Sequence, residues 1–338
     1  MARLVVGNSL RKYADRWGFV RQALWGFEGL LFAMLMGVFG LLSPDRASRF
    51  GRWLARRLGP HQDKSRIIRR NLELAFPERS EAEREELLLG VWGNMGAVAA
   101  EYPHLKRIGG SEAEQRLRVE VLGEIESLRD PSKPAVFVSG HISNWELTAA
   151  AVTRLGVPLS AVYTPPQNPW HERMLRRARE PLGCRLVPRA DSMRALMREL
   201  SDGNSIGLIM DQRVDSGTAL PFFGIPKLTT LIPARLALRY GCELVPVRTR
   251  RLQDAHFEVT LHPPVHPDDI KADEVEQARQ MTLKINAMFE QWIRETPEDW
   301  FCTKRRWAKD AVPAGSGTST ATRAGPAEDP PRDVAGLS

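Results

Sequence analysis

Residues 134–146 read Pro134-Ala-Val-Phe-Val-Ser-Gly-His-Ile-Ser-Asn-Trp-Glu146. The short apolar run Ala135–Ser139 predicts a buried strand, and the residues from Glu146 onward follow the spacing of a helix. His141 then lies in the turn between the two elements. The stretch therefore predicts the strand–turn–helix unit of an α/β fold, with a histidine in the turn and a carboxylate at the helix start.

His141 and Glu146 cannot face each other inside one helix, because five residues turn through about 500°, roughly 140° away from the same face. They can meet if His141 lies in the turn and Glu146 in the first helical turn. A histidine held by a carboxylate is a general base for a hydroxyl nucleophile at neutral pH. We predict that both residues are catalytic and that Glu146 fixes the tautomer of the ring. The alternative is that His141 only caps the helix.

Apolar runs with strand character alternate with helical patterns along most of the chain. The runs are Ala135–Ser139, Leu159–Tyr163, Ser205–Met210, Glu243–Thr249 and Phe257–Leu261, and the helical patterns are 65–76, 81–102, 146–155, 169–180, 191–201, 231–240 and 271–294. This alternation predicts an α/β fold with a mostly parallel central sheet flanked by helices. Sites in such sheets gather at the carboxyl ends of strands, where His141 and Asp211 both fall.

The N-terminal region carries an uncharged apolar run, Gly29–Leu42, between two groups of arginines. The run is short for a full span, which needs about 20 apolar residues. We predict a membrane anchor helix that lies in or dips into the cytoplasmic leaflet, and the alternative is a buried core helix. The expected organisation is a basic segment with an anchor helix (1–44), a catalytic domain (45–310) and a disordered tail (311–338).

Composition limits the partners. The net charge of +7 is spread along the chain, and no nucleic-acid motif is present. An anionic membrane surface or an acidic carrier protein fits diffuse basicity better. The three cysteines are widely spaced and odd in number, so they indicate neither a disulfide framework nor a metal site. We expect no metal and no cofactor.

Several other polar residues are candidates for substrate binding. Arg173, Arg176 and Arg177 share one helical face and could form a cationic rim for phosphates. Asp211 and Gln212 close an apolar strand, where a carboxylate can orient an arginine, a helix cap or a substrate hydroxyl. Two threonines precede a helix and either bind phosphate or cap that helix. The full set of predicted substrate-binding residues is Asn144, Asn168, Arg179, Asp211, Gln212, Thr229 and Thr230.

The stretch Gly140–Glu146 resembles the signature of the bacterial lipid A biosynthesis acyltransferases, the lauroyl/myristoyl transferase group. This group lies within the glycerolipid acyltransferase superfamily and its His-x4-Asp/Glu motif. Further blocks occur in the same order: Tyr163–Pro169 with Arg179 downstream, Gly207–Gln212, Pro221–Gly224, Thr229-Thr230 and Pro297–Trp307. The resemblance runs from about residue 20 to residue 310.

The resemblance implies a glycerol-3-phosphate acyltransferase-like fold and a membrane-associated acyltransferase. The donor would be an acyl carrier protein thioester, or acyl-CoA, and the acceptor a hydroxyl of a lipid A precursor. His141 would act as general base and Arg179 would bind near the substrate. The implied location is the inner membrane, with the catalytic domain facing the cytoplasm and in contact with membrane lipids.

The late block departs from the family pattern and leaves the acceptor open. It reads Phe301-Cys-Thr-Lys-Arg-Arg306, where lipid A enzymes often carry a tryptophan and a histidine. Another glycolipid, such as a phosphatidylinositol mannoside, or a lysophospholipid is an alternative acceptor. Lys304–Arg306, between Trp300 and Trp307, could anchor at the membrane interface, dock a carrier or form structural salt bridges.

Two further classes remain open. One is a hydrolase in which His141 activates water, although the chain has no G-x-S-x-G nucleophile elbow of a serine hydrolase. The other is a non-catalytic basic peripheral membrane protein.

Overall fold

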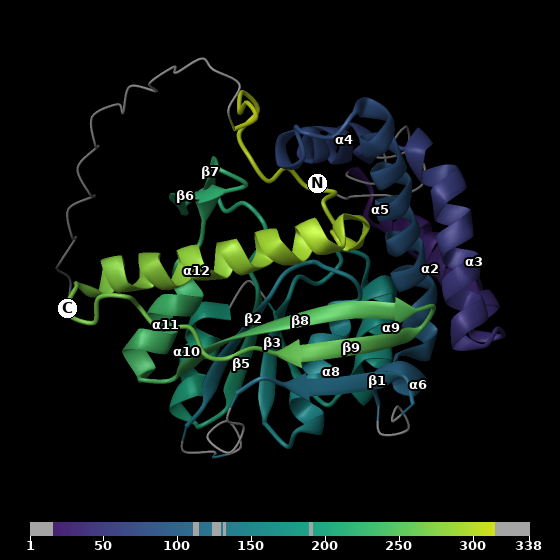
Figure 1. The fold of residues 1–338 in the computed structure, drawn as a ribbon. Coiled ribbons are helices and arrows are strands. Elements are labelled where there is room, and N and C mark those ends of the chain that lie inside the picture. The colour runs from purple at the N-terminus through teal and green to yellow at the C-terminus, as the bar shows by residue number, and fades with distance from the viewer. Residues whose placement is uncertain (1–15, 111–114, 124–129, 131–132, 189–191, 315–338) are drawn as a thin grey trace.

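A computed structural model of the chain describes residues 16–110, 115–123, 130, 133–188 and 192–314. Within them a seven-stranded sheet has the order β1-β9-β8-β2-β5-β3-β4 (Figure 1). The strands are β1 Leu117–Val121, β2 Ala135–Ser139, β3 Leu159–Tyr163, β4 Arg185–Pro188, β5 Ser205–Ile209, β8 Glu243–Gln253 and β9 His256–Leu261. A separate antiparallel hairpin joins β6 Thr218–Phe222 to β7 Ile225–Thr229.

The sheet is mostly parallel, as the alternation of strands and helices predicts. Strands β8, β2, β5, β3 and β4 run in one direction, whereas β9 is antiparallel to β8 and parallel to β1. The central strand β2 is buried along its whole length. That burial is the reason its sequence is continuously apolar rather than alternating.

Helices cover both faces of the sheet. The helices α10 Ser192–Ser201, α11 Ile232–Tyr240 and α12 Glu274–Glu295 belong to one core, and α6 Leu105–Gly109 and α8 Glu146–Arg154 to the other. Helix α9 Pro169–Arg179 packs near α6 and α2. Short 3₁₀ turns occur at Gly59–His61, Tyr102–His104, Glu180–Leu182 and Pro297–Asp299.

An N-terminal group of helices stands beside the sheet: α2 Gly18–Gly40, α3 Pro44–Leu58, α4 Lys64–Ala75 and α5 Glu81–Glu101 (Figure 1). Helix α5 begins with a capping box in which Ser80 and Glu83 each bond the other's backbone N–H. The sequence patterns predict α4 and α5 within two residues at each end. They do not predict α3, β1, β4 or the β6–β7 hairpin.

Helix α2 is longer than the apolar run that predicts it, and it is long and apolar enough to cross a membrane by length and composition. One side of it contacts the rest of the protein. Glu28, near its middle, is buried, and the Asn168 side chain donates hydrogen bonds to the Trp25 carbonyl (3.0 Å) and to Glu28 Oε2 (3.4 Å). The opposite side exposes large apolar residues, among them Leu30, Met34 and Val38.

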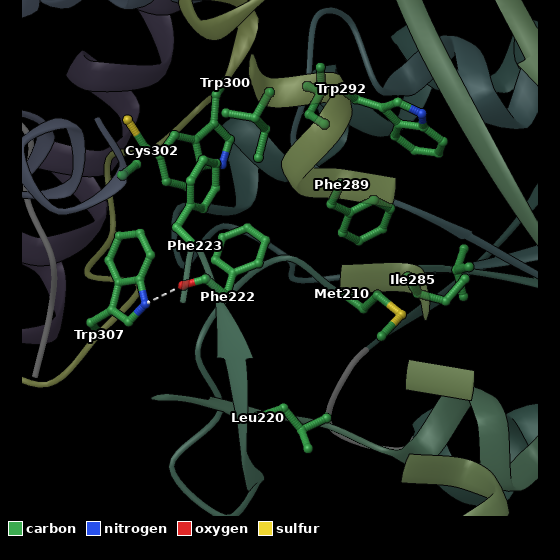
Figure 2. Close-up of a cluster of buried hydrophobic side chains, with 14 of the residues drawn as sticks. Met210, Leu220, Phe222, Phe223, Ile285, Phe289, Trp292, Trp300, Cys302 and Trp307 are labelled. Atoms are coloured by element: carbon green, nitrogen blue, oxygen red, sulfur yellow. Dashed lines mark hydrogen bonds between the residues drawn. The ribbon is translucent and has the colours of Figure 1, made fainter. Parts of the chain in front are cut away.

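The hairpin aromatics form part of a buried cluster with the late block (Figure 2). Phe223 stacks on Trp300 with ring centroids 6.0 Å apart, and Trp307 Nε1 donates to the Phe222 carbonyl at 3.2 Å. Both phenylalanines are buried in this core and do not line the cavity described below. Both side chains therefore belong to the packed core.

The contact between α3 and α5 is tight enough to require glycine. A Cβ placed on Gly51 would approach the Gly96 carbonyl oxygen and lie 2.7 Å from the Ala100 Cβ. We expect Gly51→Ala to lower the free energy of unfolding by about 1–3 kcal/mol, because the two helix backbones must separate. Thermal unfolding in detergent measures the loss.

Gly37→Ala in α2 is the matched control, because nothing lies within 4 Å of its Cβ position. It should melt at the wild-type temperature or slightly above. Equal melting temperatures for Gly51→Ala and the wild type would contradict the close helix contact.

Candidate active site

His141 forms a dyad with Asp211 at the carboxyl end of the sheet. Its Nδ1 lies 2.6 Å from Asp211 Oδ1, and its backbone N–H donates to the same oxygen at 3.1 Å. The His141 side chain is 20% exposed, whereas that of Asp211 is fully buried. This arrangement is the one in which a buried carboxylate orients an imidazole whose far nitrogen remains accessible.

Strand pairing brings the dyad together. Strands β2 and β5 are neighbours, and Ser139 lies opposite Ile209. His141 and Asp211 each come two residues after this pair, so they meet at the same edge. Sequence analysis places both residues at this edge but does not pair them, because they are 70 positions apart in the chain.

Asp211 is held on its other side by the late block. Its Oδ2 accepts hydrogen bonds from Arg306 Nη2 at 2.6 Å and from Trp300 Nε1 at 3.3 Å. Burial acts to raise the pKa of Asp211, but the charges of Arg306 and His141 together hold that pKa well below its usual range. The carboxylate is therefore ionised, and it can only accept hydrogen bonds.

Gln212 contacts the other nitrogen of the ring. Its Nε2 lies 3.0 Å from His141 Nε2, and its Oε1 accepts from Lys304 Nζ at 3.1 Å. Because Asp211 can only accept, the hydrogen-bond network assigns the proton to Nδ1 and the lone pair to Nε2. The nitrogen that would accept a proton is thus the one beside Gln212.

Glu146 is not the partner of His141, in contrast to the prediction. Its carboxylate accepts two hydrogen bonds from Arg179, Nε to Oε2 at 2.7 Å and Nη2 to Oε1 at 2.6 Å, and a third from the Tyr102 hydroxyl at 2.6 Å. Within the described part of the chain it makes no hydrogen bond to His141. The reason is that Asp211, which follows the neighbouring strand β5, already occupies Nδ1. Glu146 is the first residue of α8, and its side chain is directed toward α9.

Burial raises the pKa of the Tyr102 hydroxyl, and the neighbouring Glu146 carboxylate raises it further. Arg179 keeps a raised pKa because the Glu146 carboxylate outweighs the effect of burial. The Tyr102 hydroxyl therefore stays protonated and Arg179 stays charged. Sequence reasoning missed Tyr102, because a tyrosine at the end of a predicted helix carries no distinguishing signal.

The other predicted substrate-binding residues divide between the cavity and the framework. Asp211 and Asn144 are buried, and the Asn144 side chain donates to the buried Glu101. Thr229 is also buried and bonds its own β7 strand. Thr230 accepts from the Ile232 N–H at the start of α11 and also lines the cavity.

Asn168 caps α9 by accepting from the Trp170 N–H at 3.0 Å, and its amide group docks α2 as described above. The side chains of Arg179 and Gln212 line the cavity together with His141.

The late block supports the turn that carries His141. The Phe301 N–H donates to the His141 carbonyl at 2.8 Å, and the Ser143 N–H donates to the Asp299 carbonyl at 2.8 Å. Ser143 has φ of 53°, a left-handed conformation that is uncommon for a residue with a side chain. These two backbone bonds hold the turn in that conformation.

Trp300, Arg306 and Trp307 are all fully buried. The interpretation of this segment as an interfacial anchor is therefore wrong for these three residues, and the structural alternative describes them. Lys304 and Arg305 are exposed.

Lys227 is a buried amine that contacts the backbone of Asp211. Its Nζ donates to the Asp211 carbonyl at 3.2 Å and lies 3.9 Å from the centre of the Phe222 ring. Burial lowers the pKa of Lys227 to about 7, although the charge of Asp211 opposes the change. No local sequence pattern distinguishes this lysine from the other lysines of the chain.

The dyad opens into a cavity of about 450 Å³, within the range of small-molecule sites. His141, Glu146, Arg179, Gln212 and Lys304 give it a polar part. Apolar side chains from β2, β3, β4, β5 and α10 line the rest: Phe137, Leu159, Ala161, Leu186, Leu196 and Leu208 among them. The shape and chemistry suit a ligand with a polar reacting group and an apolar chain.

Among the described residues, no group of three or more His, Cys, Asp or Glu side chains is placed to hold a metal ion.

Comparison with known proteins shows which family this chain resembles. The sequence profile of a family described as "bacterial lipid A biosynthesis acyltransferase" matches residues 19–309. A lipid A biosynthesis acyltransferase of Haemophilus influenzae is 20% identical over 87% of this chain and 92% of its own length. A lipid A biosynthesis myristoyltransferase of Escherichia coli is 27% identical over 70% of this chain and 73% of its own length.

A phosphatidylinositol mannoside acyltransferase of Mycolicibacterium smegmatis is 23% identical over 88% of this chain and 91% of its own length.

The Asp211–Arg306 pair leads to a stability prediction. Both side chains are fully buried, so removing one leaves an uncompensated charge. We expect Arg306→Met to lower the free energy of unfolding by about 3–5 kcal/mol. Chemical denaturation in detergent measures the change, and Arg305→Met, at the exposed neighbour, should stay within about 0.5 kcal/mol of the wild type.

A double variant separates the ion pair from simple loss of packing. Adding Asp211→Asn to Arg306→Met should cost less than the sum of the single changes, because no unpaired charge remains. Additive losses would contradict a direct interaction between the two side chains.

Lys227 gives a pH prediction. Its pKa is about 7 in the folded protein against 10.5 unfolded, so between these values the unfolded chain binds more protons. Stability should therefore rise with pH across that window, by at most about 1.4 kcal/mol per pH unit. Unfolding measured from pH 6.5 to pH 10 in the wild type and in Lys227→Met should show this rise in the wild type alone. Parallel curves would contradict a neutral buried amine.

Proposed function

Because this chain belongs to the bacterial lipid A biosynthesis acyltransferase family, and is therefore an acyltransferase, we propose that it moves a fatty acyl chain from an acyl carrier protein thioester to a hydroxyl of a lipid A precursor. The single observation that carries the proposal is the His141–Asp211 dyad, whose Nε2 faces a cavity with a polar mouth and an apolar interior. A thioester and its chain require both parts.

In the proposed reaction His141 is the general base. Its Nε2 removes the proton of the acceptor hydroxyl while the oxygen attacks the thioester carbonyl. Asp211 stabilises the imidazolium that forms, as the buried acid does in other histidine-based acyl transfer sites. Collapse of the tetrahedral intermediate breaks the carbon–sulfur bond, and the proton passes from His141 to the leaving thiolate. The products are an ester and the free carrier thiol, without a covalent acyl-enzyme.

Gln212 has to yield its place at Nε2 when the acceptor hydroxyl binds. Its amide group is held by Lys304, so its N–H donors stay near the reacting centre. Gln212 thereby occupies the lone pair of Nε2 in the free enzyme. A neutral amide on the lone pair also keeps the ring oriented for the incoming hydroxyl.

Arg179 is the proposed substrate-binding cation of the site. Glu146 and Tyr102 fix its guanidinium from two sides at the cavity wall. The assignment of Glu146 as a catalytic residue accordingly becomes a proposal about positioning: it orients Arg179 toward the acyl donor or the developing oxyanion. A fixed charge stabilises a transition state better than a mobile one, because it needs no reorganisation.

The donor is proposed to be an acyl carrier protein rather than acyl-CoA. Arg173, Arg176 and Arg177 are exposed on α9, the helix that also carries Arg179. A cationic face next to the cavity suits an acidic carrier protein, which it would attract and orient.

The proposed location is the inner membrane, with the catalytic domain on the cytoplasmic side. Helix α2 exposes an apolar face, and Phe50 and Trp53 of α3 add exposed aromatic surface. The buried Glu28 at the middle of α2 contacts the catalytic domain, which favours a helix lying in the leaflet rather than one surrounded by lipid. We retain residues 1–44 as the proposed anchor segment and 45–310 as the proposed catalytic domain.

A second acceptor class is favoured by one observation. The phosphatidylinositol mannoside acyltransferase matches this chain over as large a share of its length as the lipid A enzymes do. The same dyad and cavity would serve a mannoside hydroxyl without change, so this glycolipid is the alternative acceptor.

The proposal is tested by transfer of radiolabelled acyl groups from acyl carrier protein to a tetra-acylated lipid A precursor, with a phosphatidylinositol mannoside in parallel. The purified wild type should form product. The rate of His141→Ala should be lower by about 10²–10⁴-fold, the usual contribution of a general base. His266→Ala, at an exposed histidine, is the matched control and should keep full activity.

Transfer to the mannoside alone would identify the mannoside as the acceptor and would leave the proposed reaction mechanism unchanged. Silence on both acceptors, or activity that survives His141→Ala, would contradict the proposed function.

A further inference from the structure

The cavity penetrates to the middle of the central sheet. Strand β5 lies between β2 and β3, yet Gly207 and Leu208 of β5 are partly exposed, as are Ala161 and Val162 of β3. Central strands of a covered parallel sheet are normally buried on both faces. The exposure arises because all four residues line the cavity.

Alternate residues of a strand point to opposite faces, so this cavity contacts both faces of the sheet. Gly207 and Ala161 lie on the face covered by α8, and Leu208 and Val162 lie on the face covered by α10. The α10 side reaches the surface near Met193 and Ile232, which are 41% and 40% exposed. The α8 side is walled by buried residues, including Phe137, Leu159 and Leu182.

A row of paired residues crosses the α8 side of the cavity. Strand register places Phe137 opposite Gly207, Gly207 opposite Ala161, and Ala161 opposite Leu186. The row therefore has large side chains at its two ends and the two smallest residue types in its middle. All four residues line the cavity. The small pair makes a trough in the sheet, and Leu159 lies beyond it toward the start of β3.

Nothing in the backbone explains the glycine. Gly207 does not have a positive φ, and a Cβ placed on it would make ordinary contacts, 3.6 Å to Leu159 Cδ1 and 3.8 Å to the Ala161 Cβ. Glycine also weakens a strand interior. The position can therefore accommodate a side chain. Such a side chain would reduce the free volume of the cavity.

We propose that Gly207 and Ala161 form the closed end of the site that binds the acyl chain of the donor. These two residues would then set the longest chain that the enzyme accepts. The inference rests on the proposed function and adds the sheet face on which the donor chain lies. The chain enters past His141 on the α8 side, its thioester at the dyad and its terminal methyl toward the Gly207–Ala161 trough.

The test compares wild-type protein with Gly207→Val and Ala161→Val in competition assays with acyl carrier protein loaded with chains of increasing length. The isopropyl group at either position suits a strand and fills the trough. We expect the preferred donor to become shorter by two or more carbons. The ratio of kcat/KM between the longest donor that the wild type accepts and the shorter one should fall by tenfold or more, because one misplaced methylene in an apolar pocket is worth about 10–200-fold.

Three further variants keep the outcome clear. Gly207→Ala should shift the ratio in the same direction by less, and its Cβ makes no clash that would impair folding. Ala219→Val, the same change at an exposed position of β6, should leave the ratio unchanged. Val162→Leu enlarges the neighbouring residue on the opposite face.

Normal activity with an unchanged ratio in both Gly207→Val and Ala161→Val overturns the inference and leaves the proposed function intact. A shift in Val162→Leu alone also overturns it, because the donor chain would then lie on the α10 side. Failure of the wild type to transfer any donor overturns the proposed function and the inference with it.

Discussion

The buried carboxylate of Asp211 is the interaction on which the site depends. It accepts hydrogen bonds from the ring and backbone of His141, from the guanidinium of Arg306 and from the indole of Trp300. Two of these donors come from the end of β2 and two from the late block of the chain. A buried charge is tolerated only when it is fully paired, so the four contacts fix strand β5, the histidine turn and the C-terminal segment in one arrangement.

That arrangement has a chemical consequence. The carboxylate that Arg306 stabilises in its buried position also fixes the orientation of the His141 ring. The Nε2 atom of that ring then faces the cavity and Gln212. Glu146 is occupied by Arg179 and Tyr102, so Asp211 and Glu146 have separate tasks. Asp211 orients the ring of His141, and Glu146 holds the Arg179 cation at the cavity wall. Both tasks are possible because the adjacent strands β2 and β5 end at the same edge of the sheet.

The sequence predicts the sheet well where an apolar run is continuous. The runs at 135–139 and 159–163 match β2 and β3, which both lie inside the sheet with a neighbouring strand on each side. Strand β4 is at the edge of the sheet, with Arg185 exposed at its start, and carries too weak a pattern. The sequence predicts most residues of the site, but it does not predict which of them contact each other. A spacing of five suggests Glu146 for His141, yet pairing between strands is a long-range property that local spacing cannot express. The buried Lys227 likewise has no local signal.

The contacts of the site lead us to propose that Asp211, and not Glu146, supports His141 as the base. Steady-state kinetics of Asp211→Asn and Glu146→Gln with the same acyl donor and acceptor test it most directly. Both changes keep the shape of the side chain and remove its charge. We expect Asp211→Asn to lower kcat by about 10⁴-fold, as loss of the buried acid does in a histidine triad. Glu146→Gln should act mainly on KM through Arg179. A larger loss of kcat in Glu146→Gln than in Asp211→Asn would contradict the assignment of Asp211 as the partner of His141.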